Sequence, residues 1–297
     1  MTVTQLEAFV MVAELRSFTA AAMRLGISQS AVSHAIRALE AELGVQLLRR
    51  LKGDTLLTEI GASLLLRARE MIGLFETMRQ EAADAQGLKQ GTLRIGSFGP
   101  TSSLRLLPGL LEGFRVAYPD IEVHIDEGPD HSVLQWILDR RVDVGFVVLP
   151  DERFETYPLC DDQMVALLPR RHPLATKPAL RLEELCSDPF IMTEAGSTQI
   201  VMNLFNAANL TPKVRYRSSQ VMSTLALVGR GEAVTVLAEL ALPPAGEGVV
   251  PDYVARPLLL PVQRQIGLAL HSARHASPVT RAFIQHALSV KHLLNLA

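Results

Sequence analysis

Hydrophobic positions in the first part of the chain recur at helical spacing and mark three short helices. Their apolar faces are Leu6, Phe9, Val10 and Ala13, then Phe18, Ala21, Ala22 and Leu25, and then Val32, Ile36, Leu39 and Leu43. Ser17 and Ser28 stand just before the second and third helices, where a side-chain oxygen can cap a helix N-terminus. Gly26 and Ile27 separate these two helices. The pattern therefore predicts a helix followed by two helices that a tight turn joins.

The opposite face of the third helix is polar. It consists of Gln29, Ser30, Ser33, His34 and Arg37. Hydrogen-bonding side chains at the start of a helix can contact base edges in the DNA major groove, and the two helices with their turn match a helix-turn-helix. Beyond this helix, Arg49, Arg50 and Lys52 cluster where a β-hairpin wing would lie along the phosphate backbone. Periodicity alone nevertheless favours an ordinary helical bundle with a polar surface.

Residues 59–88 are expected to form one long helix. Its apolar positions alternate in steps of four and three, a heptad seam that consists of Leu64, Ala68, Met71, Phe75, Met78 and Ala82. A helix of about 30 residues spans about 45 Å, which is too long to pack wholly on a small domain. The seam therefore predicts a dimer, and burial of the helix on its own chain is the alternative.

From residue 91 onward, short apolar strands alternate with helices and with Gly/Pro turns, which is typical of α/β units. Their order predicts a parallel sheet with crossover helices, a second α/β unit, and a last strand and helix that return to the first unit. The expected strands are 93–98, 121–125, 142–148, 164–169, 189–193, 213–216, 233–237 and 265–270. The expected helices are 101–118, 133–140, one that ends near 208, one that ends at 228, and 279–294.

The composition is that of a globular protein, and it limits the classes of protein to which the chain can belong. Of the 297 residues, 48% are hydrophobic and 20% are charged, and the net charge of −2 does not by itself favour nucleic acid. No run approaches the roughly 18 apolar residues of a membrane span, and the first residues lack the features of a secretory signal. The two isolated cysteines, Cys160 and Cys186, fit a reducing cytosol and are expected to be inert. We therefore expect a cytoplasmic protein without a membrane partner.

Motifs of catalysis are missing from the sequence. There is no Gly-x-Ser-x-Gly elbow, no His-Glu-x-x-His, no Walker loop and no Gly-x-Gly-x-x-Gly after a strand. We expect His271 and His275 on the surface rather than on a metal. The adjacent Asp161 and Asp162 are expected to be solvated rather than to act as a general acid and base. These observations predict a protein that is not an enzyme, with no catalytic residue, metal site or cofactor.

A string of residues along the first 61 positions matches a known family pattern. It consists of Leu6, Phe9, Val12, Ser17-Phe18-Thr19, Ala21-Ala22, Leu25, Ser28-Gln29-Ser30-Ala31-Val32-Ser33, Ile36, Leu39-Glu40, Leu43-Gly44, Leu47, Arg50, Leu57-Thr58 and Gly61. This string closely resembles the winged helix-turn-helix of LysR-type transcriptional regulators. Because a motif of about sixty residues is specific, the resemblance reverses the preference and favours DNA binding over an ordinary bundle.

The resemblance extends over the whole chain and implies an architecture. It implies a winged helix-turn-helix at 1–58, a linker helix for dimerisation at 59–88, and a two-lobed periplasmic-binding-protein-like α/β effector domain at 89–297. Lobe I is expected at about 91–161 plus 267–297, and lobe II at about 162–266. The implied partners are double-stranded promoter DNA, a small-molecule effector, further copies of the chain in a homodimer or a dimer-of-dimers tetramer, and RNA polymerase. A stand-alone small-molecule-binding protein and a redox-responsive regulator are the alternatives.

Hydroxyl residues at the ends of two expected strands predict the effector site. Ligands in open α/β sheets bind beyond the carboxyl ends of the strands, and two helix N-termini there suit a small anion such as a carboxylate. The candidate residues are Ser97, Phe98, Thr101, Ser102, Thr193 and Ser197. Glu194 beside them argues against a strongly anionic ligand. The alternative is that Thr101 and Ser197 only cap their helices.

Overall fold

The computed structural model describes residues 1–51, 54–85, 90–194, 197–243 and 251–294. The chain forms two compact units. The first comprises Met1–Gly91 with the short segments Leu138–Arg141 and Arg274–Pro278, and the second comprises the remaining residues. No helix within the described ranges combines the length and the hydropathy that a membrane span requires.

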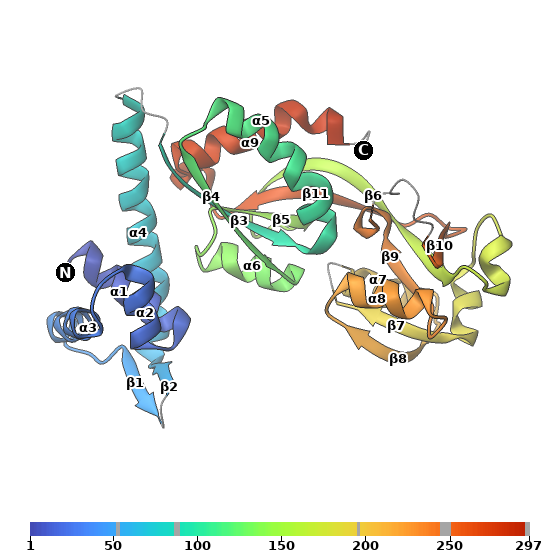
Figure 1. Cartoon of the computed structure of the whole chain (residues 1–297), viewed down its shortest axis with the longest axis horizontal. Helices are drawn as coiled ribbons and strands as arrows, with labels where there is room; N and C mark the ends of the chain where they lie inside the picture. The colour runs from blue at the N-terminus through green and yellow to red at the C-terminus, as the bar shows by residue number, and fades with distance from the viewer. Residues whose placement is uncertain (52–53, 86–89, 195–196, 244–250, 295–297) are drawn as a thin grey trace. The chain divides into compact units, whose positions relative to one another are not determined.

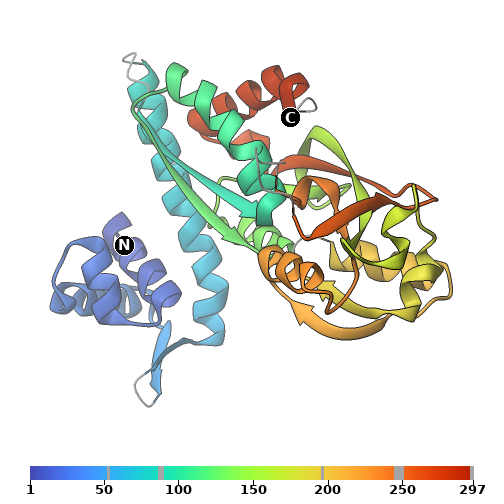
Figure 2. The same cartoon turned by 45° about the vertical axis from the view of Figure 1, so that its right-hand side comes forward.

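The first unit is a winged helix-turn-helix followed by a long helix. Its elements are α1 (Val3–Leu15), α2 (Phe18–Leu25), α3 (Gln29–Leu43), β1 (Leu48–Leu51), β2 (Asp54–Leu57) and α4 (Glu59–Ala85). The hairpin β1–β2 projects from the three short helices (Figures 1 and 2). The core of this unit contains Leu6, Ala8, Phe9, Val12, Ala21, Ala22, Val32, Ile36, Leu39 and Leu47. The three helices and their turn thus lie where the apolar spacing predicts them.

Local capping sets the boundaries of these helices. The Ser28 hydroxyl accepts the backbone N–H of Ala31 at 3.1 Å, and Ser17 caps α2 in the same way. Gly26 ends α2 in the left-handed conformation, with φ at 67°, which glycine adopts without steric cost. These contacts confirm the turn between α2 and α3.

Five expected core positions of the first unit are more exposed than predicted, and two of them, Phe18 and Leu25 of α2, are half-buried at the edge of the core. Val10 and Ala13 are only half-buried, because α1 turns Ala8 and Val12 towards the core instead. Leu43 is 39% exposed, because it is the last residue of α3. The helix period is correct, and the apolar face of α1 is rotated slightly from the predicted one.

The hairpin is tied to α3 by one glutamate. The Glu40 carboxylate accepts the backbone N–H groups of Leu47 at 2.7 Å and Leu48 at 3.2 Å, where β1 begins. The two strands pair antiparallel with Leu48 opposite Leu57. Because the glutamate holds the start of the hairpin, it fixes the wing relative to α3.

The second unit is built on a seven-stranded sheet with two crossing strands. Its order is β10-β6-β11-β5-β3-β4, and β9 also pairs with β6. The strands are β3 (Gly91–Phe98), β4 (Ile121–Gly128), β5 (Val144–Leu149), β6 (Glu155–Pro169), β9 (Thr235–Ala238), β10 (Tyr253–Pro257) and β11 (Gln263–Leu270). β3 and β5 are parallel as predicted, and β11 runs antiparallel to both β5 and β6. The long strands β6 and β11 link two lobes (Figure 1).

Lobe I contains β3, β4, β5 and the first half of β6, with helices on both faces of the sheet. The helices are α5 (Leu107–Ala117), the π-helical segment η1 (Thr101–Leu106) that precedes it, α6 (Asp130–Leu138) and α9 (Pro278–Leu294). Phe114 of α5 packs edge-on against Phe283 of α9 with ring centroids 5.3 Å apart. On the other face, α6 approaches so closely that a Cβ on Gly96 would lie 2.9 Å from Val133. Both faces are therefore buried, as crossover helices require.

Lobe II has its own core around a short parallel pair of strands. Its elements are β7 (Pro189–Thr193), β8 (Lys213–Ser218), α7 (Thr198–Ala207), α8 (Val221–Gly229), and the 3₁₀ segments η2 (Pro173–Thr176), η3 (Leu182–Ser187) and η4 (Glu239–Ala241), with β9 and β10 beside β6. Another 3₁₀ segment, η5 (Ala273–His275), precedes α9. Phe190 and Phe205 meet edge-on at 5.3 Å in this core.

Two strands of the second unit differ from the expected ones. The expected strand 164–169 is only the second half of the continuous strand β6, and β10 was not predicted. In β10 the apolar residues Tyr253 and Val254 are soon followed by Arg256 and Pro257, and most of the strand is half-buried. The run of hydrophobic residues is therefore too short to predict a strand. Pairing with β6 over five residues decides that this segment is a strand.

Candidate DNA-binding face and inter-lobe site

The polar face of α3 is available for contact. Gln29, Ser30, His34 and Arg37 are exposed and Ser33 is half-buried, on the side opposite the buried Val32, Ile36 and Leu39. The Gln29 amide donates to the Ser33 hydroxyl at 2.8 Å, and Arg37 donates to the Ser33 carbonyl at 3.2 Å. These contacts hold the polar side chains on one face of the helix. The structure thus places all five candidate residues together.

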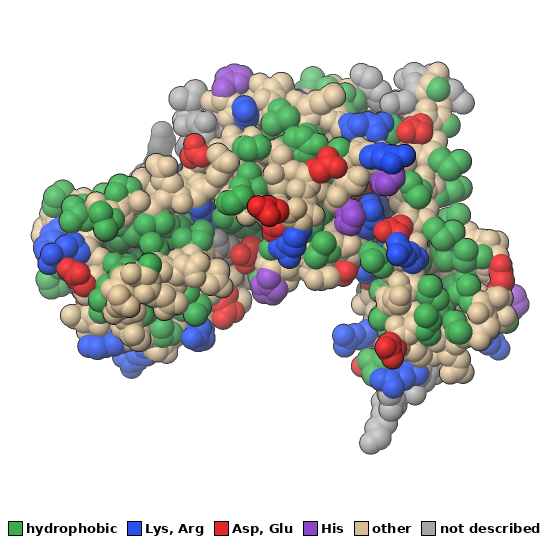
Figure 3. Space-filling view, turned by 180° about the vertical axis from the view of Figure 1, so that it is seen from behind, with side chains coloured by type: hydrophobic (Ala, Val, Ile, Leu, Met, Phe, Trp, Pro, Cys, Tyr) green, Lys and Arg blue, Asp and Glu red, His purple; other side chains and the backbone are tan. Residues whose placement is uncertain are grey.

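The basic residues of the wing lie partly outside the described residues. Arg49 is an exposed residue of β1, and Arg50 belongs to the same strand opposite Thr55. Lys52 falls outside the described residues. Lys and Arg side chains are spread over the face of the molecule that Figure 3 shows. This arrangement can supply phosphate contacts beside a helix in the major groove.

The seam of α4 divides into two parts. Leu64 and Ala68 pack against the core of the first unit. Met71, Phe75 and Met78 are 45%, 40% and 66% exposed. Three large apolar side chains at heptad spacing on a free helix face are typical of a surface that another helix covers. Part of the seam is therefore buried on its own chain, whereas its members Met71, Phe75 and Met78 are exposed.

Two oppositely charged side chains meet inside the second unit, on the crossing strands. Arg264 of β11 stands opposite Asp162 of β6 in the strand register. The Arg264 guanidinium donates to Asp162 Oδ2 through Nε at 2.8 Å, and its Nη2 lies 2.7 Å from the same oxygen. The two side chains are only 2% and 1% exposed. Burial lowers the pKa of Arg264, and the charge of the Asp162 carboxylate opposes this shift.

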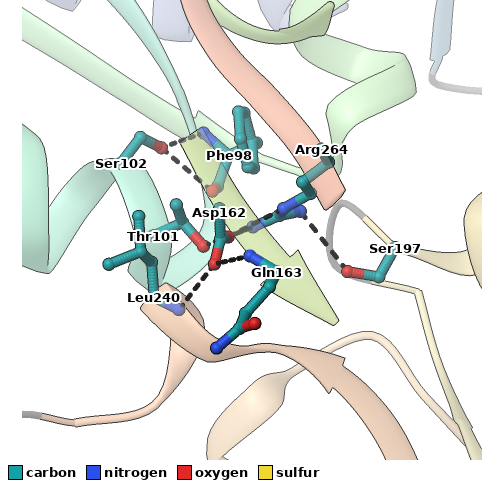
Figure 4. A network of polar contacts seen from close by, with 8 residues as sticks. All are labelled: Phe98, Thr101, Ser102, Asp162, Gln163, Ser197, Leu240 and Arg264. Carbon is teal, nitrogen blue, oxygen red and sulfur yellow. Dashed lines mark hydrogen bonds and ion pairs between the residues drawn. The ribbon is translucent and has the colours of Figure 1, made fainter. Parts of the chain in front are cut away.

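Arg264 also contacts both lobes. Its Nη2 donates to the Thr101 hydroxyl of lobe I at 2.9 Å, and its Nη1 donates to the Ser197 hydroxyl of lobe II at 3.4 Å (Figure 4). The guanidinium carbon lies 5.8 Å from the centroid of the Phe98 ring, within the range of a cation–π contact. One side chain therefore joins β6, η1 and the start of α7.

Asp162 extends this network to a further element. Its Oδ1 accepts the backbone N–H of Leu240 in η4 at 3.1 Å and that of Gln163 at 2.8 Å (Figure 4). The carboxylate is therefore bonded through both oxygens. A buried ion pair is tolerated only when its remaining polar atoms are satisfied in this way.

All six candidate effector residues are buried, and the structure brings three of them together. Thr101 and Ser197 meet through Arg264, and the ring of Phe98 lies beside the same guanidinium. The Ser197 hydroxyl makes no capping bond and Pro100 rather than Thr101 precedes η1, so the capping alternative is wrong.

The other three candidates bond to near neighbours within one lobe. Ser97 and Ser102 share a hydrogen bond of 2.8 Å, and the Ser102 hydroxyl also bonds the backbone of Phe98. The Thr193 hydroxyl bonds that of Thr224 at 2.8 Å. These contacts position the end of β3 and the end of β7, and they do not reach Arg264.

The expectation that Asp161 and Asp162 are both solvated is correct for Asp161 and wrong for Asp162. Asp161 is exposed, whereas Asp162 is buried against Arg264. Alternation along a strand puts neighbours on opposite faces, and β6 is a strand at this point rather than a connecting segment. A charged residue before each of the apolar runs of β6 and β11 was the only signal in the sequence that could have indicated the pair.

The cysteines and histidines stay outside this network. Burial is the main cause that raises the pKa of Cys160, to about 11, and burial also raises the pKa of Cys186. Because the thiolate is the reactive form, neither environment activates the sulfur for oxidation. His271 and His275 are exposed. The described residues hold no group of three or more His, Cys, Asp or Glu side chains able to bind a metal.

A winged helix-turn-helix with a polar helix face, on the same chain as a two-lobed α/β domain, defines the class of ligand-responsive DNA-binding proteins. Comparison with known proteins agrees. Residues 3–62 match the bacterial regulatory helix-turn-helix protein family named after LysR, and residues 86–291 match the LysR substrate binding domain. The chain therefore belongs to the LysR family of transcriptional regulators, which bind DNA and are not enzymes. A stand-alone small-molecule-binding protein is excluded by the N-terminal match.

Individual relatives share this organisation over nearly their full length. The chain is 34% identical over 288 residues to YvbU of Bacillus subtilis (strain 168), an uncharacterised transcriptional regulator, and the alignment covers 97% of this chain and 98% of YvbU. A full-length OxyR variant from Pseudomonas aeruginosa is 25% identical, with a TM-score of 0.75 over 98% of both chains. HinK, a LysR family regulator from Pseudomonas aeruginosa, is 28% identical with a TM-score of 0.60 over 100% of this chain and 99% of HinK.

Proposed function

We propose that this regulator reads a specific promoter sequence through the polar face of α3 and that a small effector controls it where the two lobes meet. In this proposal residues 1–58 bind DNA, residues 59–88 pair two copies, and residues 89–297 bind the effector. The proposal that an effector controls the regulator rests on one observation: the buried Arg264 donates hydrogen bonds to hydroxyls of both lobes. An effector that changes these bonds changes the energy with which the lobes are held together.

DNA recognition requires two copies of α3 on a two-fold-related site. A homodimer through α4 supplies them, because a two-fold axis in the protein matches half-sites about one helical turn apart on the duplex. A pair of such dimers would give the tetramer, and RNA polymerase is a further candidate partner at the promoter. Arg49, Arg50 and Lys52 would add phosphate contacts that carry no base preference.

Replacing Gln29 and Ser33 with Ala in one variant is expected to reduce sequence discrimination. Each lost base contact removes about 1–3 kcal/mol of preference for the correct base pair. The measurement is fluorescence anisotropy on the duplex that the wild-type protein selects from a random library, compared with a scrambled duplex. Gln46→Ala is the matched control, because Gln46 is exposed beyond the other end of α3. A folded double variant with unchanged discrimination would contradict the role of this face.

The effector site is proposed around Thr101, Ser197 and Arg264, with Phe98 as an apolar contact and Ser97, Ser102 and Thr193 holding the strand ends. A small mono-anion with a further polar group, such as a carboxylate, remains the ligand class we propose. The N-terminal ends of η1 and α7 supply donors for it. Because Asp162 already neutralises Arg264, the anion has to compete with Asp162 for the guanidinium.

Thr101→Val is expected to weaken effector binding more than Ser97→Ala does. Loss of one neutral hydrogen bond corresponds to roughly three- to tenfold in affinity. Thr101 contacts Arg264 directly, whereas Ser97 contacts only neighbouring serines. Calorimetry against a panel of metabolites identifies the ligand, and the same titration is then repeated with both variants. If a ligand that changes transcription binds both variants as tightly as wild type, the proposed site is wrong.

A further inference from the structure

A cavity lies on the crossing strands, and it shares Arg264 with the network described above. It has a volume of about 390 Å³, within the range of small-molecule sites. It is formed where the end of β5 meets β11 and β6. Its lining includes Leu149, Thr156, Pro158, Asp161, Gln263 and Gln265.

Strand register places the polar lining on the face opposite the buried ion pair. Leu149, Gln265 and Asp161 stand side by side across β5, β11 and β6. Arg264 and Asp162 are the next residues along β11 and β6, and successive side chains of a strand point to opposite faces. Burial agrees, since Asp161 and Gln265 are exposed whereas Arg264 and Asp162 are buried. The cavity and the ion pair thus use opposite faces of the same two strands.

The charge at this cavity is negative. Arg264 borders the cavity between the two glutamines, but Asp162 balances its charge. Within the described part of the chain, the contact found for the Asp161 carboxylate is the Gln265 amide, which donates to it at 3.0 Å, and no cation lies within ion-pair distance. An exposed carboxylate with only an amide partner leaves one negative charge at the cavity.

Other charged groups nearby do not reverse this sign. Asp151, close to the end of β5, is paired with Arg153. Glu239 lies beside the same face of β6, where its carboxylate accepts from the Gln163 amide at 2.6 Å. The surroundings therefore add negative charge or none.

We propose that this cavity binds a small organic cation, a primary ammonium group on a short hydrocarbon. The ammonium has three donors, which match the Asp161 carboxylate and the side-chain oxygens of Gln263 and Gln265. Leu149 and Pro158 supply the apolar contact for the hydrocarbon. The bound cation would contact both β6 and β11, the strands that link the two lobes, and would therefore affect how the lobes are held together. Arg264 contacts both lobes from the opposite face of these strands. The site is independent of the anion site proposed above.

The test uses n-butylammonium as a probe on the full-length protein, with 1-butanol and butyrate as neutral and anionic probes of similar shape. Binding is followed by ligand-observed NMR titration. We expect n-butylammonium to bind at least roughly tenfold more tightly than the other two probes, because a charge-assisted hydrogen bond is worth that factor. Equal binding of the three probes, or no binding of the ammonium, would overturn the proposal.

Asp161→Asn keeps the shape of the side chain and removes its charge. We expect it to weaken n-butylammonium binding roughly tenfold, with unchanged circular dichroism because the residue is exposed. Glu239→Gln is the matched control, since it also removes an exposed carboxylate that an amide contacts. Gln263→Leu, a second variant, is expected to weaken binding without any change of charge. Wild-type affinity in Asp161→Asn, or an equal loss in Glu239→Gln, would show that the cavity is not the site.

Discussion

Replacing Phe75 with Asp is expected to convert the oligomer into a smaller assembly and to abolish tight DNA binding. Phe75 is 40% exposed on α4 and lies at heptad spacing between the exposed Met71 and Met78. In a dimer through this face, the carboxylate would be buried without a partner, which costs several kcal/mol, of the order of the stability of many dimers. Analytical ultracentrifugation across a concentration series measures the change.

The control for this prediction carries the same charge on another face of the same helix. Gly73→Asp adds a carboxylate at an exposed position where a new Cβ meets no atom within 4 Å. It is expected to keep the wild-type assembly. If Phe75→Asp also keeps the wild-type sedimentation coefficient, α4 does not pair through Met71, Phe75 and Met78, and another surface makes the oligomer.

Replacing Arg264 with Met is expected to destabilise the second unit by about 3–5 kcal/mol, the cost of leaving one member of a buried ion pair without its partner. Asp162 would keep only its two backbone contacts in a site where its side chain is 1% exposed. Urea unfolding followed by fluorescence reports on this unit, because the only tryptophan of the chain, Trp136, lies on α6.

The double variant Arg264→Met/Asp162→Leu separates the ion pair from packing. With both charges removed, no buried charge is left unpaired, so most of the lost stability is expected to return. The double variant is also expected to lose the bonds that Arg264 makes to Thr101 and Ser197. If Arg264→Met alone costs less than 1 kcal/mol, the network does not hold the lobes together in the way that the distances indicate.

Local features of this protein followed from the sequence because they depend on neighbours along the chain. The caps by Ser17 and Ser28 each involve atoms three residues apart, and the polar face of α3 follows from a period of 3.6 residues. The alternation of strands and helices also predicted that β3 and β5 run parallel, because a crossover helix returns the chain in the direction of the preceding strand. A family motif of sixty residues then added the function that periodicity alone did not support.

Tertiary structure decided whatever joins distant segments. Arg264 lies 102 positions from Asp162 and 163 positions from Thr101, and no periodic signal links residues so far apart. The same holds for the cavity, because it depends on the register of three strands, and for α4, where packing against the first unit covers Ala68 and leaves Met78 open. The sequence by itself determined most of the elements and the polar face of α3, through which we propose that the protein contacts DNA. The fold alone decided which charged groups are buried together, since desolvation and pairing are properties of a three-dimensional neighbourhood rather than of a residue type.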